Sequence, residues 1–346
     1  MRIAIFLPNW IGDAVMATPA LRAVRQHYGS RARLIGIARP YIEPVLQGNP
    51  YLDEWFSYQP HLRGRLALVE RLRKSPIDIA LLLTNSLSTA LLAWCSGARR
   101  RIGFARYWRS FLLTDRLHAP RRGGCFEPRS AVDHYLDVAR SLGCQIASPH
   151  LELTTTPGEE QRADQVWKHP GLAGAAQVVV LNTGSARGSA KSWPLTSFTA
   201  LAAKLVQRQD IAVLVICGPA ERDAAAAVAR RAAHPRVVAL DQWPLGIGLS
   251  KACIRRSDCV VTTDSGPRHL AAAFGVPSLA LFGPTDPRWS YNYHDAETIV
   301  SEDPDCGPCG QSHCPLQHHR CMRDLSVERV LGATLLKLDR GRQRSA

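Results

Sequence analysis

The chain has 346 residues, of which 46% are hydrophobic and 21% are charged. These fractions are typical of a globular protein and exclude the disordered, collagen-like and coiled-coil classes. No apolar stretch reaches the roughly 18 residues that a membrane-spanning helix requires. The N-terminus is broken early by Pro8 and lacks the small-residue cleavage site of a secretory signal. We therefore expect a cytoplasmic protein with two domains of ordinary size.

The net charge of +14 is concentrated in the first half of the chain. Residues 1–150 hold 21 Lys and Arg against 10 Asp and Glu, whereas residues 151–346 hold 22 against 19. A positive field of this kind attracts nucleic acid, an acidic membrane surface or a phosphorylated substrate, and the charge alone does not choose among them. Simple solubility is a further explanation for part of it.

Short apolar runs alternate with segments of helical period, which is the pattern of βαβ units in a parallel sheet. In the first half, the expected strands are Arg2–Leu7, Arg33–Ile37, Ile77–Leu83 and Arg101–Phe104. The expected helices are one that follows the loop Pro8–Gly12 and ends at Gly29, then Arg63–Lys74, Ser88–Cys95 and Ala131–Leu142.

Residues 147–160 contain two prolines and three consecutive threonines and are the expected linker. A second βαβ series follows it, with expected strands Val178–Asn182, Ala212–Cys217, Val237–Leu240, Cys259–Thr262 and Ser278–Phe282. The expected helices are Leu195–Arg208, Ala220–Ala233, Gly248–Arg256, Pro267–Phe274 and Val327–Leu338. We predict an α/β protein with two doubly wound, Rossmann-like domains facing each other across a cleft, with domains 1–160 and 161–346.

The segment Thr263–His269 joins an expected strand to an expected helix. Small residues at such a junction, here Ser265 and Gly266, expose backbone N–H groups to an anion, and the helix dipole adds a favourable field. In the alternative interpretation, Asp264 or Ser265 only caps the helix. The position at the carboxyl end of a strand favours phosphate binding.

The segment Thr183–Pro194 is a second candidate phosphate loop. It is rich in Gly and Ser, including Gly184 and Ser185, and it carries the cation Lys191. It lacks the strict Walker pattern, but Lys191 could reach a phosphate held by the Ser265–Gly266 turn; the alternative is an ordinary surface loop. Neither loop has the Gly-x-Gly-x-x-Gly pattern of a dinucleotide fold, which disfavours an oxidoreductase.

Two carboxylates follow expected strands. Asp13 stands after the first strand, where it either stabilises the following helix or takes a proton from an attacking hydroxyl. Glu221 stands after the strand that ends at Cys217, at a position suited to a ribose diol, although a carboxylate in the first turn of a helix is the ordinary explanation.

The ten cysteines are expected to be thiols, and six of them, including Cys95, Cys217 and Cys259, are expected in the core. The other four are Cys306, Cys309, Cys314 and Cys321, with His313, His318 and His319 nearby. These are zinc-ligand types, but the spacing matches no standard finger. Zinc, a redox-sensitive cluster and plain thiols therefore all remain open, and catalysis by the cluster is not expected.

Several motifs together resemble the bacterial ADP-heptose:lipopolysaccharide heptosyltransferases of glycosyltransferase family 9. The matching stretches, which span nearly the whole chain, are Pro8–Arg22, Ala190–Pro194, Thr263–Ala273, Gly275–Pro277 and Leu281–Pro287. Within the first stretch, Asn9–Asp13 is typical of the type II members. Arg268 stands where members commonly carry Met.

The resemblance implies a GT-B fold with an N-terminal acceptor domain and a C-terminal ADP-sugar domain. It implies an inverting, metal-independent transfer of heptose to the inner-core heptose of lipopolysaccharide, with no cofactor. Asp13 would be the general base, and the donor-binding residues would be Gly184, Ser185, Lys191, Glu221, Asp264, Ser265, Gly266 and His269. The basic first half would meet the phosphorylated acceptor at the cytoplasmic face of the inner membrane.

Two other classes compete with this interpretation. A sugar-nucleotide epimerase shares the two-domain architecture and needs no lipid acceptor. A nucleic-acid-binding protein would explain the charge without catalysis, but the sequence shows no recognition-helix motif and no aromatic-basic platform, so no nucleic-acid partner is expected.

Overall fold

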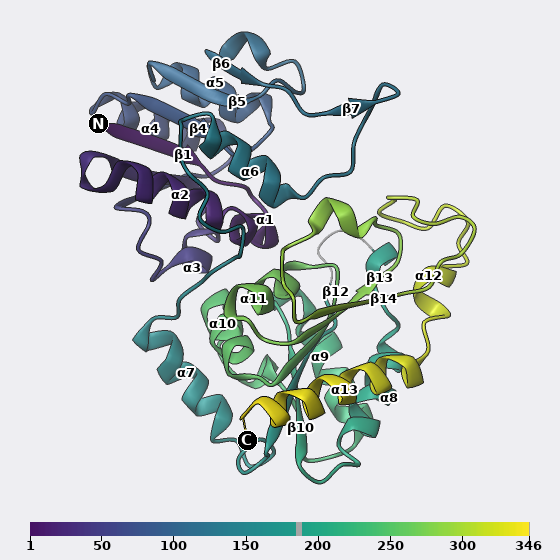
Figure 1. The fold of residues 1–346 in the computed structure, drawn as a ribbon. Helices are drawn as coiled ribbons and strands as arrows, with labels where there is room; N and C mark the ends of the chain where they lie inside the picture. Colours follow the sequence, from purple (N-terminus) through teal and green to yellow (C-terminus); the bar gives the residue numbers. More distant parts are fainter. Residues whose placement is uncertain (185–188, 346) are drawn as a thin grey trace. The chain divides into compact units, whose positions relative to one another are not determined.

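The computed structural model describes residues 1–184 and 189–345 (Figure 1). The chain divides into two compact units. Unit 1 is Met1–Thr154 together with Arg288–Tyr293, and unit 2 is Thr155–Pro287 together with His294–Ala346. The return of residues 288–293 to unit 1 is a feature that the apolar pattern did not indicate. Among the described helices, none is long and apolar enough to cross a bilayer.

Unit 1 is built on a six-stranded sheet in the order β3-β2-β1-β4-β5-β6, with every pair parallel. Its strands are β1 (Arg2–Phe6), β2 (Arg33–Ala38), β3 (Glu54–Ser57), β4 (Ile79–Leu82), β5 (Arg100–Phe104) and β6 (Asp115–Leu117). A separate antiparallel hairpin joins β7 (Arg121–Arg122) to β8 (Cys125–Phe126). The order, with β1 beside both β2 and β4, is that of a doubly wound fold.

The helices of unit 1 cover both faces of its sheet (Figure 1). They are α1 (Ile11–Met16), α2 (Thr18–Tyr28), α3 (Glu43–Leu46), α4 (Leu62–Arg73), α5 (Leu87–Cys95) and α6 (Ala131–Arg140). The single helix expected after β1 is two helices that meet at Ala17. Pro19 lies in the first turn of α2, where its missing N–H and fixed φ favour a new helix start.

Unit 2 repeats the architecture with the order β11-β10-β9-β12-β13-β14, again all parallel. Its strands are β9 (Gln177–Asn182), β10 (Ile211–Ile216), β11 (Val237–Ala239), β12 (Cys259–Thr263), β13 (Ser278–Phe282) and β14 (Glu297–Ser301). β9 and β10 are buried at every position, as the near-continuous apolar runs of a two-sided sheet require.

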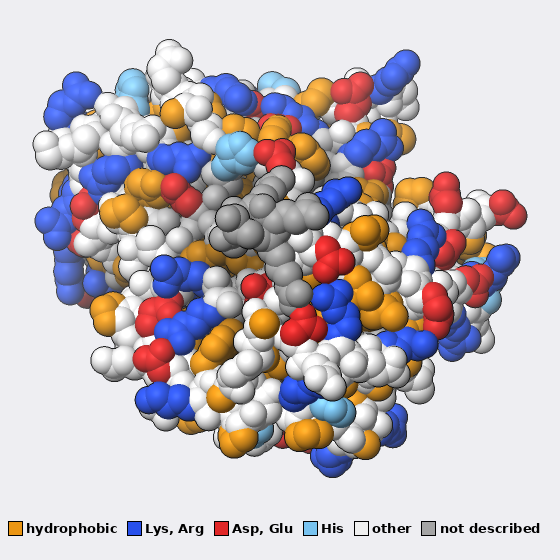
Figure 2. Space-filling view, turned by 60° about the horizontal axis from the view of Figure 1, so that its bottom comes forward, with side chains coloured by type: hydrophobic (Ala, Val, Ile, Leu, Met, Phe, Trp, Pro, Cys, Tyr) orange, Lys and Arg blue, Asp and Glu red, His pale blue; other side chains and the backbone are white. Residues whose placement is uncertain are grey.

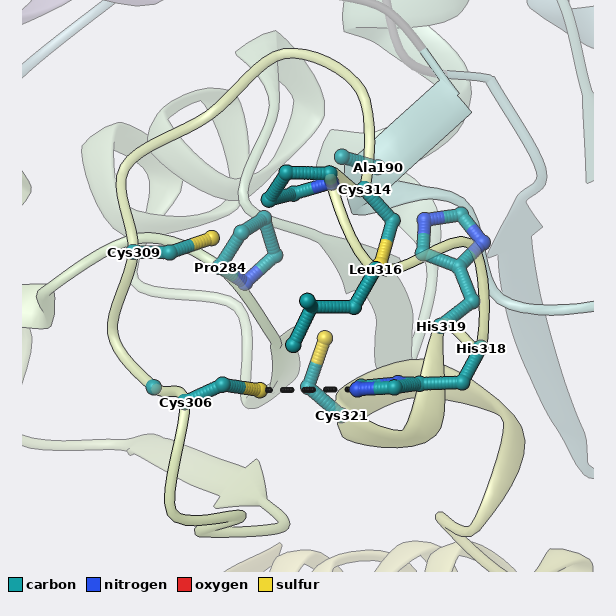
Figure 3. A pocket seen from close by; sticks show the side chains of 11 residues that line it. Ala190, Pro284, Cys306, Cys309, Cys314, Leu316, His318, His319 and Cys321 are labelled. Atoms are coloured by element: carbon teal, nitrogen blue, oxygen red, sulfur yellow. Dashed lines mark hydrogen bonds between the residues drawn. The ribbon is translucent and has the colours of Figure 1, made fainter.

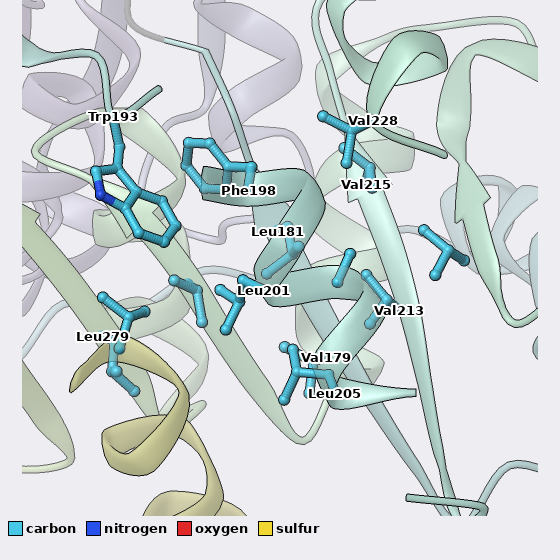
Figure 4. Close-up of a cluster of buried hydrophobic side chains, with 14 of the residues drawn as sticks. Val179, Leu181, Trp193, Phe198, Leu201, Leu205, Val213, Val215, Val228 and Leu279 are labelled. Atoms are coloured by element: carbon cyan, nitrogen blue, oxygen red, sulfur yellow. The ribbon is translucent and has the colours of Figure 1, made fainter. Parts of the chain in front are cut away.

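The helices of unit 2 are α7 (Pro157–Trp167), α8 (Leu195–Leu205), α9 (Arg222–Ala232), α10 (Ile247–Arg256), α11 (Gly266–Phe274), α12 (Arg320–Arg323) and α13 (Val327–Ser345). Figure 4 shows α8 laid against β9 and β10, with Leu201 and Leu205 meeting Val179 and Val213 in one buried cluster. Trp193 closes this core, and its Nε1–H donates to Leu325 O at 3.0 Å.

The boundary between the two units lies inside the expected linker 147–160, after Thr154. The last four residues of that range are nevertheless helical, because α7 begins at Pro157. Thr156 accepts the N–H of Glu159, and the Glu159 side chain accepts the N–H of Thr156, which is a complete capping box. Glu159 also lies 3.1 Å from Lys251 Nζ of α10, and both side chains are buried. These contacts make α7 part of unit 2 rather than a free connection.

All ten cysteines are free thiols. Cys217 and Cys259 are buried as expected, but Cys95 is only half-buried, because it lies at the end of α5, and Cys125 is exposed on β8. On the face drawn in Figure 2, acidic and basic side chains are interspersed around scattered apolar ones.

Candidate functional site

Lys191 and Asp264 meet at the carboxyl edge of the unit 2 sheet. Lys191 ends a short 3-10 turn before α8, and Asp264 follows directly on β12. The Lys191 Nζ atom lies 2.5 Å from Asp264 Oδ2 and 3.3 Å from Asp264 O, and the two side chains are only 11% and 10% exposed. The two loops predicted to hold phosphate are therefore joined by an ion pair.

Asp264 is held by further partners. Thr285 Oγ1 donates to Asp264 Oδ2 at 3.0 Å, and Arg268 Nη1 lies 3.4 Å from Asp264 Oδ1. Burial by itself would raise the pKa of the Asp264 carboxyl, but the charges of Lys191 and Arg268 outweigh it and hold the pKa well below its ordinary value. The Asp264 carboxylate is therefore ionised in the folded protein at neutral pH.

Arg268 is fully buried, and its guanidinium makes two bonds to Glu297 at the start of β14, of 2.8 and 2.7 Å. Such a fork geometry fixes a planar guanidinium against a carboxylate. Because Arg268 also faces Asp264, one buried cation bridges two acids. Neither Arg268 nor Glu297 was predicted as a site residue.

The first turn of α11 is not capped by its N-cap residue. Ser265 occupies the N-cap position without a side-chain capping bond. Its Oγ instead accepts from Asn182 Nδ2 at 3.0 Å, and the same amide donates to Gly184 O at 3.1 Å. The alternative that the Ser265 side chain caps the helix is therefore wrong. The N–H groups at Gly266 begin a helix whose positive end favours an anion.

Three buried polar atoms at this edge have no hydrogen-bond partner among residues 1–184 and 189–345. They are Thr183 Oγ1, Thr263 Oγ1 and His269 Nδ1. Asn182 of β9 pairs with Thr262 of β12, and Thr183 and Thr263 come directly after these two residues in the sequence. An unpartnered buried polar group costs about 1–3 kcal/mol, so a concentration of them indicates a site that a polar ligand completes.

His269 lies one turn into α11 and is buried. Burial, reinforced by the positive charge of Arg268, holds the pKa of the imidazole well below its ordinary value. The ring is neutral at physiological pH, so it offers a hydrogen bond rather than a charge to a ligand.

Gly184 and Glu221 lie against each other. A Cβ atom added to Gly184 would come within 2.1 Å of Glu221 Oε1, so this position takes no larger residue without displacing the carboxylate. The other oxygen, Glu221 Oε2, accepts the N–H of Gly218 at 2.9 Å. Glu221 therefore has the local backbone role considered from sequence, and it also lies at the loop that was predicted to bind the donor. Ser185 lies outside the described residues.

Asp13 belongs to unit 1, in the first turn of α1. Its side chain is half-buried, and the hydroxyl of Tyr135 on α6 points to Asp13 Oδ1 at 3.4 Å. Burial and the negative charge of Asp13 together raise the pKa of Tyr135 well above its ordinary value. Tyr135 therefore stays protonated. No sequence motif had indicated it as a partner of Asp13.

The four clustered cysteines line a small cavity of about 60 Å³ (Figure 3). Cys306 Sγ lies 3.9 Å from His318 Nε2. Burial, followed by the neighbouring thiols of the cluster, raises the pKa of Cys321. Within the part of the chain that the structure describes, no three His, Cys, Asp or Glu side chains form a group that could hold a metal ion.

The Cys-rich segment lies outside both candidate phosphate loops in the sequence, but the fold brings it against one of them. Ala190, the residue before Lys191, lines the cysteine cavity, and its N–H donates to Ser312 O at 3.2 Å. The segment therefore supports the loop that carries Lys191.

The comparison with protein families decides among the candidate classes. Residues 65–320, which are most of the chain, match the model of glycosyltransferase family 9 (heptosyltransferase). The chain belongs to glycosyltransferase family 9. It is therefore an enzyme of the glycosyltransferase class, as its motifs indicated.

Curated relatives of this family 9 protein match it over nearly its full length. The lipooligosaccharide heptosyltransferase 2 of Campylobacter jejuni is 25% identical over 339 residues, covering 96% of each chain. The lipopolysaccharide heptosyltransferase 2 of Escherichia coli K12 is 25% identical over 353 residues, covering 96% of this chain and 97% of the relative.

Solved structures confirm the fold of this family 9 protein. The structure of E. coli ADP-heptose lps heptosyltransferase II matches with a TM-score of 0.81 at 22% identity, over 100% of both chains. The E. coli heptosyltransferase WaaC with ADP-2-deoxy-2-fluoro heptose matches with a TM-score of 0.71 at 18% identity, over 96% of this chain and 98% of that one. The predicted GT-B class, with two Rossmann-like α/β domains, is confirmed.

Proposed function

We propose that this protein transfers a heptose from ADP-L-glycero-D-manno-heptose to the inner-core heptose of lipopolysaccharide, with inversion at the anomeric carbon and without a metal ion. Membership in family 9 supports the transfer of a heptose. The full-length likeness to type 2 heptosyltransferases supports the acceptor, and the ADP-sugar bound to a related enzyme supports the donor.

The observation that carries the proposal is the ion pair of Lys191 and Asp264 beside the uncapped start of α11. Unit 2 is the donor-binding unit in this proposal. Lys191 and the N–H groups at Gly266 neutralise the diphosphate, Thr183 and His269 complete its hydrogen bonds, and Glu221 is available to the ribose. Unit 1 binds the acceptor.

The proposed reaction is a single displacement. The acceptor hydroxyl gives its proton to the Asp13 carboxylate while its oxygen forms a bond to the anomeric carbon. The bond between that carbon and the β-phosphate oxygen breaks, and its electron pair leaves with ADP. Attack on the face opposite to the departing phosphate inverts the configuration. Lys191 and the positive end of α11 stabilise the charge that develops on ADP.

The acceptor is anionic and attached to a lipid, which gives the surplus charge of unit 1 a natural partner at the cytoplasmic face of the inner membrane. The proposal therefore includes peripheral contact with that membrane, and it includes no nucleic-acid partner.

Mass analysis of the reaction product tests the proposal. The purified protein is incubated with ADP-heptose and a core acceptor truncated after its first heptose. The proposal predicts an acceptor heavier by one heptose together with free ADP, and a product of inverted anomeric configuration by NMR. A changed sugar with an unchanged acceptor would instead indicate an epimerase. If no product of either kind formed, the proposed donor or the proposed acceptor would be rejected.

A further inference from the structure

We infer that the outward side of α4 and α5, together with the loop Ala105–Phe111 and the β7–β8 hairpin, docks on the surface of an anionic phospholipid bilayer. We call this surface the α4–α5 face. The inference rests on the proposed function in one respect, because both assume that the acceptor is attached to a lipid. Binding to a bilayer can nevertheless be measured without any transfer of heptose.

The helix α5 presents an apolar stripe to solvent. Leu87, Leu91 and Trp94 are 46%, 47% and 54% exposed. Their spacing of four and then three residues places them on one side of the helix. The opposite side of α5 is already buried against the sheet through residues such as Ala90 and Ala93. The outer stripe is therefore not part of the core of unit 1.

The loop after β5 extends this stripe with three exposed aromatic residues. Tyr107, Trp108 and Phe111 are 68%, 92% and 73% exposed. Tyr107 and Trp108 have φ of 52° and 58°, a left-handed conformation that bulky residues rarely adopt and that costs free energy. The backbone is thus held in a strained form in which large apolar rings point into water.

A buried arginine holds this loop in place. Arg109 has no exposed surface, and it donates to Phe104 O at 3.0 Å, to Thr84 O at 2.6 Å and to Asn85 Oδ1 at 3.1 Å. These bonds tie the aromatic loop to the ends of β4 and β5. The exposed rings are therefore carried by an ordered loop.

The helix α4 lies beside α5 and adds two exposed leucines. Leu62 and Leu66 are 71% and 58% exposed and are one turn apart. The inner sides of α4 and α5 share one core cluster, to which Leu112, next to Phe111, also belongs. The apolar side chains of α4, α5 and the aromatic loop therefore lie over the same face of the sheet.

The same part of the chain carries most of the net charge of the protein. Residues 61–126 contain 13 Lys and Arg but only 3 Asp and Glu, a surplus of 10 against +14 for the whole chain. Each of the three acids already faces a cation: Glu70 lies 3.1 Å from Lys74, Asp78 lies 3.9 Å from Arg99, and Asp115 lies 2.7 Å from Arg100.

The β7–β8 hairpin places part of this charge beside the aromatic loop. The guanidinium groups of Arg106 and Arg121 lie 3.6 and 4.3 Å from the centre of the Phe126 ring. Arg106 precedes Tyr107, so this contact joins the hairpin to the loop. Arg121 and Arg122 are exposed on the hairpin.

Apolar side chains within a positive field fit a bilayer better than other anionic partners. Leucine and tryptophan enter the boundary between headgroups and acyl chains, and arginine attracts the anionic headgroups. Nucleic acid would use the arginines and the aromatic rings but offers nothing to the leucines of α4 and α5. A second copy of this chain would bring a surplus of ten positive charges against an identical one.

The α4–α5 face also lies close to the catalytic edge of unit 1. Leu87 follows β4, Tyr107 follows β5 and Asp13 follows β1 in the same parallel sheet. The carboxyl ends of parallel strands lie at one edge. Docking through this face would hold that edge near the bilayer in which a lipid-linked acceptor resides.

Vesicle sedimentation with the full chain tests the inference. We expect binding to phosphatidylcholine vesicles that contain phosphatidylglycerol, weak binding to pure phosphatidylcholine, and a decline with salt. The triple variant Leu91→Ser, Trp108→Ser and Phe111→Ser should lower the partition coefficient by about tenfold or more. The matched control is Ile299→Ser, Leu316→Ser and Leu336→Ser, which removes exposed apolar residues of unit 2 and should bind as wild type.

A second pair of variants tests the charge. Arg121→Gln with Arg122→Gln should weaken binding to anionic vesicles at low salt, whereas Arg230→Gln with Arg231→Gln, an exposed pair near the end of α9, should not. The triple variant should keep its melting temperature, its affinity for ADP and its transfer to a delipidated core acceptor. This last measurement separates failure of docking from failure of the proposed function.

Three results would overturn the inference. The first is vesicle binding that is equal in the triple variant and its control. The second is wild-type binding to single-stranded RNA, lost in the triple variant, without any binding to vesicles. The third is a dimer in solution that the triple variant dissociates while vesicle binding is absent.

Discussion

The ammonium of Lys191 lies 2.5 Å from the Asp264 carboxylate, although the two residues are 73 positions apart in the sequence. Both are about nine-tenths buried. Asp264 also faces Arg268. Its carboxylate therefore keeps a cation as a partner when Lys191 turns to an incoming phosphate. The pair thus holds a positive charge in position at the carboxyl edge of the sheet before a donor arrives.

Lys191→Ala should weaken the binding of ADP by roughly 1.5–3 kcal/mol, the value of a hydrogen bond to a charged group. Calorimetry on the full chain measures it. Lys204→Ala is the matched control, because Lys204 makes only an exposed ion pair with Glu328 on the same unit. Equal ADP affinity in the two variants would remove Lys191 from the donor site.

Arg268→Met should destabilise unit 2 by about 3–5 kcal/mol, because it removes the buried guanidinium that makes two bonds to Glu297 and also faces Asp264. Adding Glu297→Gln should recover part of this loss. Arg329→Met is the control, since Arg329 pairs with Glu302 at the surface and its removal should cost less than about 1 kcal/mol. Denaturant unfolding that ranks the two arginines equally would contradict the buried pair.

Much of the fold was predictable because its core strands are continuous apolar runs. The strands of both sheet centres lie within a residue or two of their expected positions, as β1 and β9 illustrate. Three edge strands were missed: β3, β6 and β14 are three to five residues long and partly exposed. Their stability comes from pairing with a neighbour, which a local pattern does not contain.

The helix α7 was not predicted, although the sequence contains a signal for its N-terminus. Thr156, Pro157 and Glu159 are a capping-box signature, but three threonines and a proline suggested a linker. In the candidate site, the proximity of Lys191 and Asp264 was predictable because loops that follow parallel strands share one edge of a sheet. Arg268 and Glu297 were missed because a buried charge pair depends on burial and on a partner 29 residues away.

The pH dependence of stability should include a contribution from His269. Burial and Arg268 lower the pKa of His269 in the folded protein, so acidification protonates the unfolded chain first and destabilises the fold. Between pH 7 and pH 5, the free energy of unfolding should fall by up to about 1.4 kcal/mol per pH unit for this one proton.

The variant His269→Gln should show a shallower decline. Other histidines whose pKa values burial lowers, namely His134, His294 and His319, should contribute to the decline that remains. His118→Gln, at an exposed position, should leave the slope unchanged. Urea unfolding at several pH values measures the slopes. A His269→Gln slope equal to that of wild type would contradict a buried neutral imidazole.

The cysteine cluster should support structure rather than chemistry, because it contacts Ala190 of the Lys191 loop and lies outside the proposed displacement. Treatment with EDTA should therefore leave the initial rate of transfer unchanged. If EDTA abolished the rate and zinc restored it while circular dichroism showed an intact fold, a catalytic metal would have to be admitted.

The proposed mechanism requires Asp13 to remove the proton of the acceptor hydroxyl, and the kcat of the Asp13→Asn variant tests that claim. Asn keeps the size of the side chain but cannot take up the proton, so kcat should fall by about 10² to 10⁴ while ADP affinity and melting temperature stay close to wild type. Tyr135→Phe removes the hydroxyl that faces Asp13 but keeps the carboxylate, so it should retain much more activity. A kcat for Asp13→Asn within a few-fold of wild type would contradict the claim and leave Asp13 only the role of stabilising α1.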